Sequence, residues 1–191
     1  ITDSFGSETV AALEVGRRVR NLANSTSWGL SIASSTLVGQ ALGAGEESEA
    51  TAYGSQIITL AFVIHVIVAA VVIALAEPIA ALFVDDAAAV ALSATFVAVS
   101  ALSLIAMGVD GSATGALRGA GDTQVPFYAS LIGLYVFTLP VAYLGIVTQL
   151  GVTALFVALV LETAVPSAVT LWRFNTGAWP AVSRDYRPGA D

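Results

Sequence analysis

Long apolar runs recur along the chain and limit the folds that it can adopt. The ranges 56–76, 87–117, 126–147 and 150–172 consist mostly of apolar residues. A helix of about 20 apolar residues is long enough to cross a bilayer. Of the 191 residues, 57% are hydrophobic and 11% are charged, a balance far more apolar than that of a soluble domain. The sequence therefore predicts an all-α integral membrane protein.

A fifth range, 22–44, is more polar and is rich in Ser, Ala, Gly and Thr. Small residues let helices approach closely, so this range suits a span that packs inside a bundle. The range 8–21 is expected to start its helix. Glu77 and Pro78 are expected to end the second span, and the residues that follow, up to Asp86, favour a short interfacial helix and a turn. The expected fold is a polytopic bundle of about five transmembrane helices.

A polar, glycine-rich hinge lies between the runs at 87–117 and 126–147. Because each run is long enough to cross the bilayer, the hinge is expected at a membrane surface. The side chain of Asp122 or Thr123 is expected to cap the next helix, and Pro126 fits the first turn of that helix. The hinge motif comprises Gly115, Arg118, Gly119, Gly121, Asp122 and Pro126.

The arginines indicate the orientation of the chain. With five spans, Arg118 and the three arginines of the tail at 173–191 lie on one side of the membrane, and Arg17, Arg18 and Arg20 lie on the other. Positive residues favour the cytoplasmic side of a membrane. Four arginines against three therefore predict a multi-pass protein of the cell membrane with a cytoplasmic C-terminus.

Composition bounds the partners of the chain. The formal net charge is -7, and all seven basic residues are arginine. Nucleic acids are recognised by clusters of positive charge, so the expected partner is the lipid bilayer and not nucleic acid. The sequence carries no cysteine and no motif for a cofactor or a metal. We expect neither group, and we expect a protein that is not an enzyme.

Four stretches follow one another at helix-length spacings. They are LVGQALGAG at 37–45, PIAALFVD at 78–85, the hinge GALRGAGDTQVP at 115–126 and RFNTGAW at 173–179. Together they resemble the C-terminal lobe of the multidrug and toxic compound extrusion (MATE) transporters.

The resemblance implies a protein of twelve helices in two lobes that works by alternating access. Such a protein exports organic cations, drugs and other small amphipathic compounds in exchange for Na⁺ or H⁺. On that plan the five spans are the eighth to twelfth helices, and the range 1–172 is part of the C-terminal lobe, followed by the cytoplasmic tail at 173–191. The N-terminal lobe and the preceding helix are then missing partners, so we expect a fragment that does not transport alone.

Three ionisable residues at bilayer depth are candidates for ion coupling, because such groups are costly inside a membrane. Asp110 is interpreted either as a group that takes up H⁺ or Na⁺ or as a carboxylate held by neighbouring helices. His65 is either a proton relay or a neutral packing residue. Glu162 is either a gating group or a packed polar contact. Beside Asp110, the spacing of Gly111 and Gly115 predicts a close helix contact.

Two prolines predict kinks in the last two spans. Pro166 has no N–H for the Glu162 carbonyl, so a bend is expected beside that carboxylate. Pro140 is expected to bend its helix in the same way and to free the Val136 carbonyl.

Two other functions stay open. A flippase for lipid-linked oligosaccharides, from the same superfamily, needs a strongly cationic cavity, for which only the arginine cluster at 17–20 speaks. The range 119–122 also matches the Gly-x-Gly-Asp pattern of intramembrane aspartyl proteases, with Asp110 and Asp122 as a dyad that shares a proton. That hypothesis requires both acids within the membrane, whereas Asp122 is expected at the surface.

Overall fold

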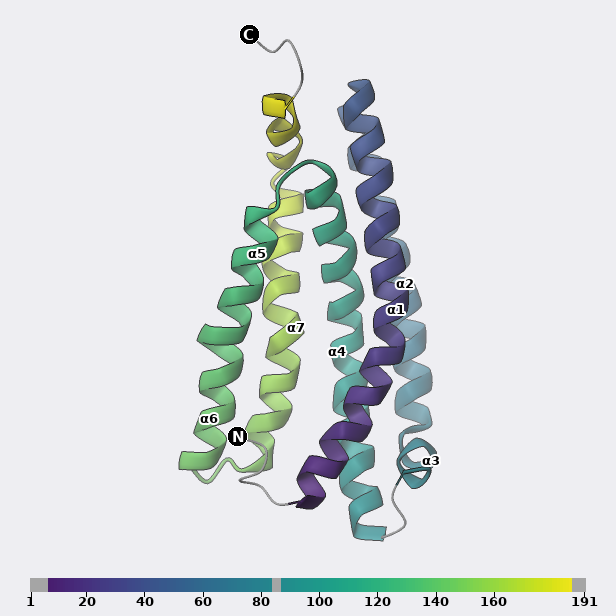
Figure 1. Cartoon of the computed structure of the whole chain (residues 1–191). Helices are drawn as coiled ribbons and strands as arrows, with labels where there is room; N and C mark the ends of the chain where they lie inside the picture. The colour runs from purple at the N-terminus through teal and green to yellow at the C-terminus, as the bar shows by residue number, and fades with distance from the viewer. Residues whose placement is uncertain (1–6, 84–86, 187–191) are drawn as a thin grey trace.

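A computed structural model of the chain describes residues 7–83 and 87–186, and every element in these ranges is helical. The long helices run side by side as a bundle, with α4 between the pair α1 and α2 and the helices α5 to α7 (Figure 1). The elements are α1 (Ser7–Ala44), α2 (Glu47–Ala74), α3 (Ala76–Ala81), α4 (Ala87–Gly119), α5 (Gln124–Leu131), the π-helical η2 (Ile132–Thr138), α6 (Leu139–Val147), α7 (Val152–Asn175) and the 3₁₀-helical η3 (Trp179–Tyr186).

Four helical segments are long and apolar enough to cross a membrane: Glu47–Ala74, Ala89–Gly119, Gln124–Val147 and Val152–Asn175. The prediction of an all-α membrane bundle is confirmed. The remaining predicted span belongs to α1, which has 38 residues and is more polar than the other four. It is one continuous helix from Ser7, so the ranges 8–21 and 22–44 are not separate pieces.

The break after the second span lies at Leu75, and the prediction that Glu77 and Pro78 end that span is wrong. Leu75 donates its N–H to the Val71 carbonyl at 3.0 Å, and its own carbonyl accepts the N–H of Ile79 at 2.9 Å. Glu77 and Pro78 lie in the first turn of α3. A proline is tolerated there because first-turn N–H groups have no intrahelical partner. The acidic pair at 85–86 lies outside the described residues.

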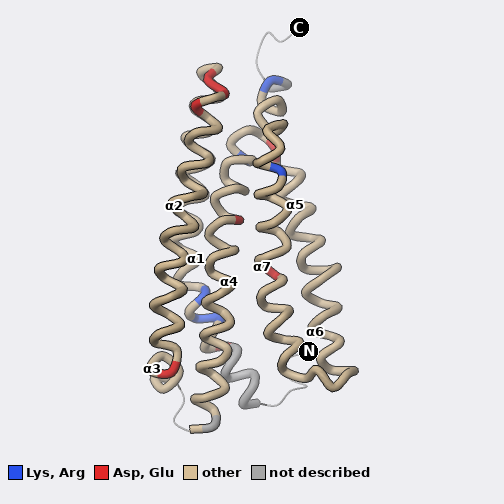
Figure 2. Tube along the Cα trace, turned by 180° about the vertical axis from the view of Figure 1, so that it is seen from behind, with Lys and Arg blue, Asp and Glu red and all other residues tan. Residues whose placement is uncertain are grey.

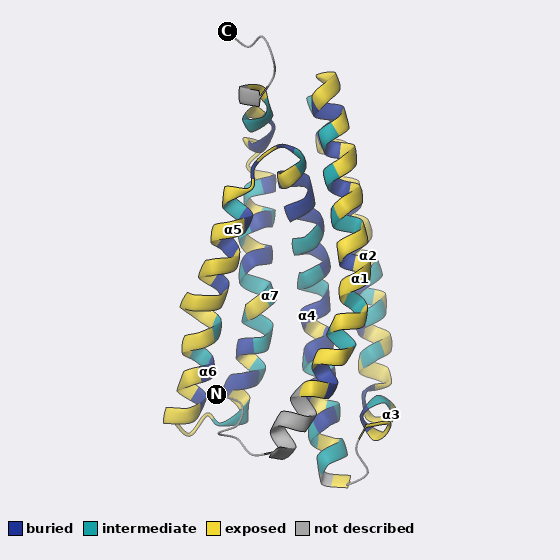
Figure 3. Cartoon of the chain, in the orientation of Figure 1, coloured by how far each residue is buried: buried dark blue, intermediate teal, exposed yellow. Residues whose placement is uncertain are grey.

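A seam of small residues joins α4 to α1. Gly111, Gly115 and Gly119 repeat every four residues, and each lies against a serine of α1 one helical turn further along: Ser27, Ser31 and Ser35. A Cβ on Gly119 would lie 2.5 Å from the Ser35 carbonyl oxygen, so a larger residue does not fit without movement. The close helix contact expected at Gly111 and Gly115 is present, and it makes α4 the most buried of the long helices (Figure 3).

The hinge closes α4 with a left-handed glycine. Gly121 has φ of 86°, its N–H bonds to the Arg118 carbonyl at 3.0 Å, and the N–H of Asp122 bonds to the Leu117 carbonyl at 2.9 Å. These two bonds form a Schellman motif, which satisfies the last carbonyls of the helix.

The capping prediction for the hinge is wrong. Thr123 is the N-cap residue of α5, but its side chain makes no capping hydrogen bond. Asp122 is buried and accepts a 2.7 Å hydrogen bond from Nε of Arg173 on α7. A guanidinium outcompetes the backbone N–H groups because it satisfies the carboxylate and neutralises its charge. Pro126 lies in the first turn of α5, as expected.

The helix that carries Pro140 changes its winding before the proline instead of breaking. Residues 132–138 form the π-helical η2, and Pro140 begins the next α-helical turn. The Thr138 hydroxyl donates to the Gly133 carbonyl five residues back at 2.9 Å. Gly133 in turn faces Pro166 of α7, where an added Cβ would lie 2.9 Å from the proline ring. Pro166 therefore packs against η2, whereas Pro140 lies beyond η2 in α6 and is exposed.

The first part of the tail is held against the bundle. Trp179 is fully buried, stacks on Phe174 with ring centroids 5.1 Å apart, and donates its indole N–H to the Phe174 carbonyl at 2.9 Å. Further along, Arg184 binds both carboxylate oxygens of Glu47 on α2 at 2.8 and 2.7 Å. The stretch at 173–179, one of the four that carry the family resemblance, thus packs the start of the tail against the end of α7.

Candidate functional site

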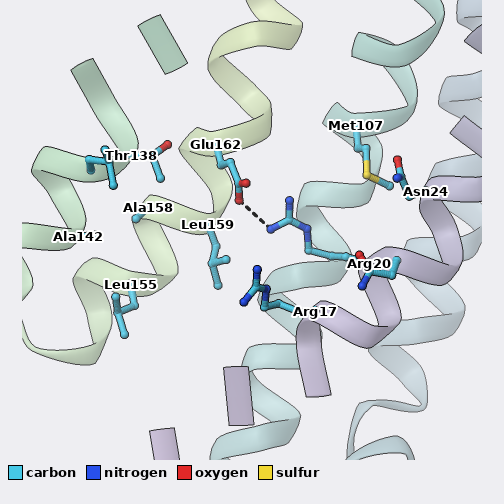
Figure 4. Close-up of a pocket in the computed structure, with 12 residues that line it drawn as sticks. Arg17, Arg20, Asn24, Met107, Thr138, Ala142, Leu155, Ala158, Leu159 and Glu162 are labelled. Atoms are coloured by element: carbon cyan, nitrogen blue, oxygen red, sulfur yellow. Dashed lines mark hydrogen bonds and ion pairs between the residues drawn. The ribbon is translucent and has the colours of Figure 1, made fainter. Parts of the chain in front are cut away.

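A cavity of about 510 Å³ opens between α1, α4, the η2–α6 helix and α7. Charged residues are sparse along the middle of the helices, so those that line this cavity stand out (Figure 2). One wall is polar and comes from α1, and the opposite wall is mostly apolar (Figure 4). The lining residues are Arg17, Arg20, Asn21, Asn24, Met107, Thr138, Leu139, Ala142, Leu155, Ala158, Leu159 and Glu162.

The polar wall follows from the spacing of four residues on α1. Positions 17, 20, 21 and 24 recur every three or four residues and therefore share one helix face. That face is too polar for lipid, which explains why α1 is the least apolar of the five long helical segments. It turns instead toward the cavity (Figure 4).

An ion pair crosses the cavity. Nη1 of Arg20 lies 2.9 Å from Oε2 of Glu162 on α7, and the two side chains are 16% and 42% exposed. Glu162 lies ten residues after the start of α7, about 15 Å along its axis, so the pair sits within the helical part of the bundle. The predicted coupling residue therefore already has a positive partner, which the sequence did not indicate.

Asp110 makes a different set of contacts. It lies on α4 about 14 Å before the last residue of that helix, and it is partly buried. The Thr170 hydroxyl of α7 donates to its Oδ1 at 2.9 Å, and the Thr114 hydroxyl approaches the same oxygen at 3.5 Å. Both donors are neutral, so they hold the carboxylate across two helices without neutralising a charge on it.

His65 is buried against α4. Its Nδ1 lies 2.8 Å from the Ala61 carbonyl, and a carbonyl only accepts, so Nδ1 carries the proton of that bond. Gly108 leaves the space that the imidazole ring fills. His65 also lines a second, mostly apolar cavity of about 470 Å³, which includes Arg18 and shares no lining residue with the first. His65 therefore has no hydrogen-bond partner in common with Asp110 or Glu162 among the described residues.

The hypothesis of a protease dyad is not supported by the placement of its two acids. Asp122 lies beyond the end of α4, more than nine residues of helix from Asp110, about 14 Å or more along the axis. Asp122 pairs with Arg173, whereas Asp110 binds Thr170. A dyad that shares a proton requires two carboxyl groups in direct contact.

The other hinge residues have structural places. Gly115 and Gly119 belong to the seam with α1, Gly121 forms the left-handed turn, and Arg118 is exposed in the last turn of α4. Among the described residues, no group of three or more His, Asp and Glu side chains lies close enough to hold a metal ion.

Sequence reasoning missed the asparagines Asn21 and Asn24 and the hydroxyl of Thr170. The asparagines had a usable signal, because they repeat the spacing of Arg17 and Arg20 on one helix face. Thr170 had none, since its contact with Asp110 joins residues 60 positions apart.

The fold is that of a membrane transporter. Over 94% of this chain, the structure superposes with a TM-score of 0.85 on the crystal structure of the eukaryotic MATE transporter AtDTX14, at 21% identity and over 40% of that chain. An inward-facing multidrug resistance MATE family transporter of the MOP superfamily aligns with a TM-score of 0.79 over 96% of this chain and 43% of its own, at 18% identity. The family model MatE matches residues 1–144. The chain belongs to the MATE family.

Relatives in sequence agree. The chain is 27% identical over 175 residues to a probable multidrug resistance protein NorM of Thermotoga maritima, covering 91% of this chain and 38% of the relative. It is 31% identical over 171 residues to a protein of the same name from Rhodopseudomonas palustris, covering 87% and 36%. The chain thus spans less than two fifths of the length of these relatives.

Proposed function

We propose that the native gene product is a secondary active transporter that exports small amphipathic compounds in exchange for Na⁺ or H⁺ by alternating access. This chain supplies one wall of the transport path. The observation that carries the proposal is the setting of Asp110, whose carboxylate lies within a membrane-length helix. Neutral hydroxyl groups bind this carboxylate, and among the described residues no arginine forms an ion pair with it. An acid in that setting gains most from a bound cation or proton.

The contacts of Asp110 suggest how ion binding is linked to movement. The Thr170 hydroxyl also donates to the Pro166 carbonyl at 3.0 Å, one turn earlier in the same helix. The hydroxyl therefore has two acceptors to choose from, the carboxylate and the carbonyl. A cation or proton bound to Asp110 weakens the hydrogen bond that its carboxylate accepts from Thr170, and this changes the contact between α4 and α7.

The two other candidates are less suited to ion coupling. Arg20 neutralises Glu162, so a cation there has to displace a guanidinium. His65 is packed between two helices and bonded to a backbone carbonyl. We therefore assign ion coupling to Asp110. Glu162 instead lines the cavity, and His65 contributes to helix packing.

Drug export is favoured over the flippase. The relatives are named as probable multidrug resistance proteins, and the arginines that line the cavity are paired with carboxylates. Arg17 binds Glu14 at 3.0 Å and Arg20 binds Glu162 at 2.9 Å. A strongly cationic cavity, which a lipid-linked oligosaccharide would need, is not formed by these pairs.

The test is dye efflux and ion-driven uptake by the native gene product in proteoliposomes. Asp110→Asn keeps the hydrogen-bond acceptor for Thr170 but removes the charge, so we expect gradient-driven transport to be lost while the protein stays folded. Thr170→Val is expected to weaken coupling and Thr170→Ser, the matched control, to keep it. Unchanged gradient-driven transport by Asp110→Asn would refute the assignment. A sodium gradient at fixed pH and a pH gradient without sodium identify the coupling ion.

The orientation of the chain is a second part of the proposal. Arg17, Arg18 and Arg20 lie about three turns into α1 and not in a loop, so they do not count against the positive-inside rule. This supports the proposal that the C-terminal end lies on the cytoplasmic side. The chain has no cysteine of its own, so Ser183→Cys and Gln149→Cys in a cysteine-free version report the two ends of α7. An impermeant maleimide on intact cells should label only position 149.

A further inference from the structure

Among the described residues, each of the two guanidinium groups on the polar wall of the cavity makes one side-chain hydrogen bond. Arg20 engages Glu162 through Nη1 alone, and Arg17 engages Glu14 through Nη1 alone. A guanidinium offers five N–H donors in a fork that fits a carboxylate with two parallel bonds. In Figure 4 both groups extend from α1 toward the space in front of Glu162 and the apolar wall.

In this cavity, the ion pair between Arg20 and Glu162 lies next to an apolar surface, and a ligand can replace one partner of the pair. Glu162 is 42% exposed and belongs to the same cavity as Arg20, so an incoming carboxylate can reach the guanidinium from the open side. The opposite wall offers Leu155 and Leu159, and Met107 of α4 adds an apolar side chain beside Asn24 (Figure 4). A volume of about 510 Å³ lies within the range of small-molecule sites, about 300 to 1,000 Å³.

The charge that a ligand must carry follows from what happens to Glu162 when the ligand displaces it from Arg20. A carboxylate that takes Arg20 leaves Glu162 as an unpaired charge inside the bundle, which is unfavourable. A ligand that also carries an ammonium group supplies the missing counter-charge. A simple organic cation meets two guanidinium groups and gains Glu162 only by separating it from Arg20.

We propose that this cavity binds amphipathic zwitterions: the ligand's carboxylate binds Arg20 and Arg17, its ammonium group binds the released Glu162, and its apolar body lies on Leu155 and Leu159. The inference rests on the proposed transport function, whose substrate class it narrows. Arg20 and Glu162 are then the residues that determine specificity.

The test uses three fluorescent probes with the same apolar body. Nε-dansyl-lysine is a zwitterion, its methyl ester is a cation, and its Nα-acetyl derivative is an anion. Equilibrium binding to the native gene product in detergent is followed by dansyl fluorescence. We expect the zwitterion to bind at least about tenfold more tightly than the ester, because a bidentate guanidinium–carboxylate contact is among the strong hydrogen-bonded pairs.

Three variants assign the effect to residues. Arg20→Gln is expected to weaken binding of the zwitterion by about tenfold or more and to strengthen binding of the ester, because it frees Glu162 for the ester's ammonium group. Arg20→Lys, which keeps the charge without the fork, is expected to fall between. Glu162→Gln is expected to weaken the zwitterion and strengthen the acetylated anion. The matched control is Arg18→Gln, since Arg18 lies on the same helix but over the Phe83 ring, 5.5 Å from its centroid, and lines the other cavity.

The outcomes separate this inference from the transport function. Equal affinity for the zwitterion and its ester in the unaltered protein overturns the inference, as does an equal effect of Arg18→Gln and Arg20→Gln. Ion-driven export of cationic dyes that depends on Asp110, without any preference for the zwitterion, leaves the transport function standing and the inference refuted. Binding of the zwitterion that depends on Arg20, without ion-driven transport, supports the inference and refutes the function. Size-exclusion profiles of each variant verify that it is folded.

Discussion

Two arginine–carboxylate pairs connect α7 to the rest of the bundle, and they differ in their surroundings. At the hinge, Nε of Arg173 lies 2.7 Å from Asp122, and the side chains are 22% and 6% exposed. In the cavity, Nη1 of Arg20 lies 2.9 Å from Glu162, and the side chains are 16% and 42% exposed. The bond lengths are close, so what separates the pairs is how much solvent can reach the carboxylate.

The difference indicates two roles for one kind of contact. The hinge carboxylate is enclosed by the turn that ends α4, so solvent has little access to it if Arg173 is lost. The cavity carboxylate faces an open space, in which water or a ligand can take the place of its partner. The enclosed pair therefore stabilises the fold, and the open pair is suited to exchange.

The largest effect is expected from Asp122→Ala. The substitution leaves Arg173 without its partner beside a buried turn, and removal of one member of a buried pair costs about 3 to 5 kcal/mol. Because Arg173 is 22% exposed, we expect the lower end of that range, about 3 kcal/mol of the free energy of unfolding. Denaturant unfolding of the native gene product in detergent measures it.

Asp122→Asn is the matched control for that substitution, since it keeps an acceptor oxygen for Nε of Arg173. Its loss should be smaller than that of Asp122→Ala. A loss below about 1 kcal/mol for Asp122→Ala, as at exposed pairs, would show that the hinge pair is no more structural than the cavity pair.

The next largest effect is expected in the coupling energies of the two pairs, which should differ. In a double-mutant cycle, Asp122→Asn with Arg173→Gln isolates the hinge contact, and Glu162→Gln with Arg20→Gln isolates the cavity contact. We expect roughly 2 kcal/mol of coupling at the hinge and less than about 1 kcal/mol in the cavity. Equal coupling energies would remove the basis of the comparison.

Much of the fold could be predicted from the sequence because its signals are local. Runs of apolar residues identify membrane-length helices wherever they occur, and the glycines at 111, 115 and 119 repeat on one face and so announce a close contact. The miss at Leu75 has a local cause as well, since proline is compatible with either the end of one helix or the first turn of the next.

The contacts of the site could be predicted much less well. Asp110 and Glu162 were identified as charges at membrane depth, but their partners Thr170 and Arg20 lie 60 and 142 positions away in the sequence. Asp122 shows the same limit. Its local surroundings favour a helix cap, and only the fold reveals the arginine that binds it instead.

A small effect on stability is expected from Arg20→Gln. The variant removes the counter-charge of Glu162, but that carboxylate is 42% exposed and faces the open cavity, so the free energy of unfolding should change by less than about 1 kcal/mol. The measurement is the same denaturant unfolding. A loss of about 3 kcal/mol would place this pair in the structural class of Asp122 and would argue against a ligand displacing it.

The smallest effect is expected from Arg184→Gln, which breaks a third pair that is more exposed than the other two. Arg184 binds both carboxylate oxygens of Glu47, but its side chain is 61% exposed and that of Glu47 33%. Solvent and salt screen such a contact, so its loss should hardly shift the unfolding midpoint at physiological ionic strength and should matter more at low salt. Unfolding at two salt concentrations measures both. If the midpoint instead falls as far as in Asp122→Ala, and by the same amount at both concentrations, then exposure does not rank these pairs, and the cavity pair loses its main claim to be displaceable.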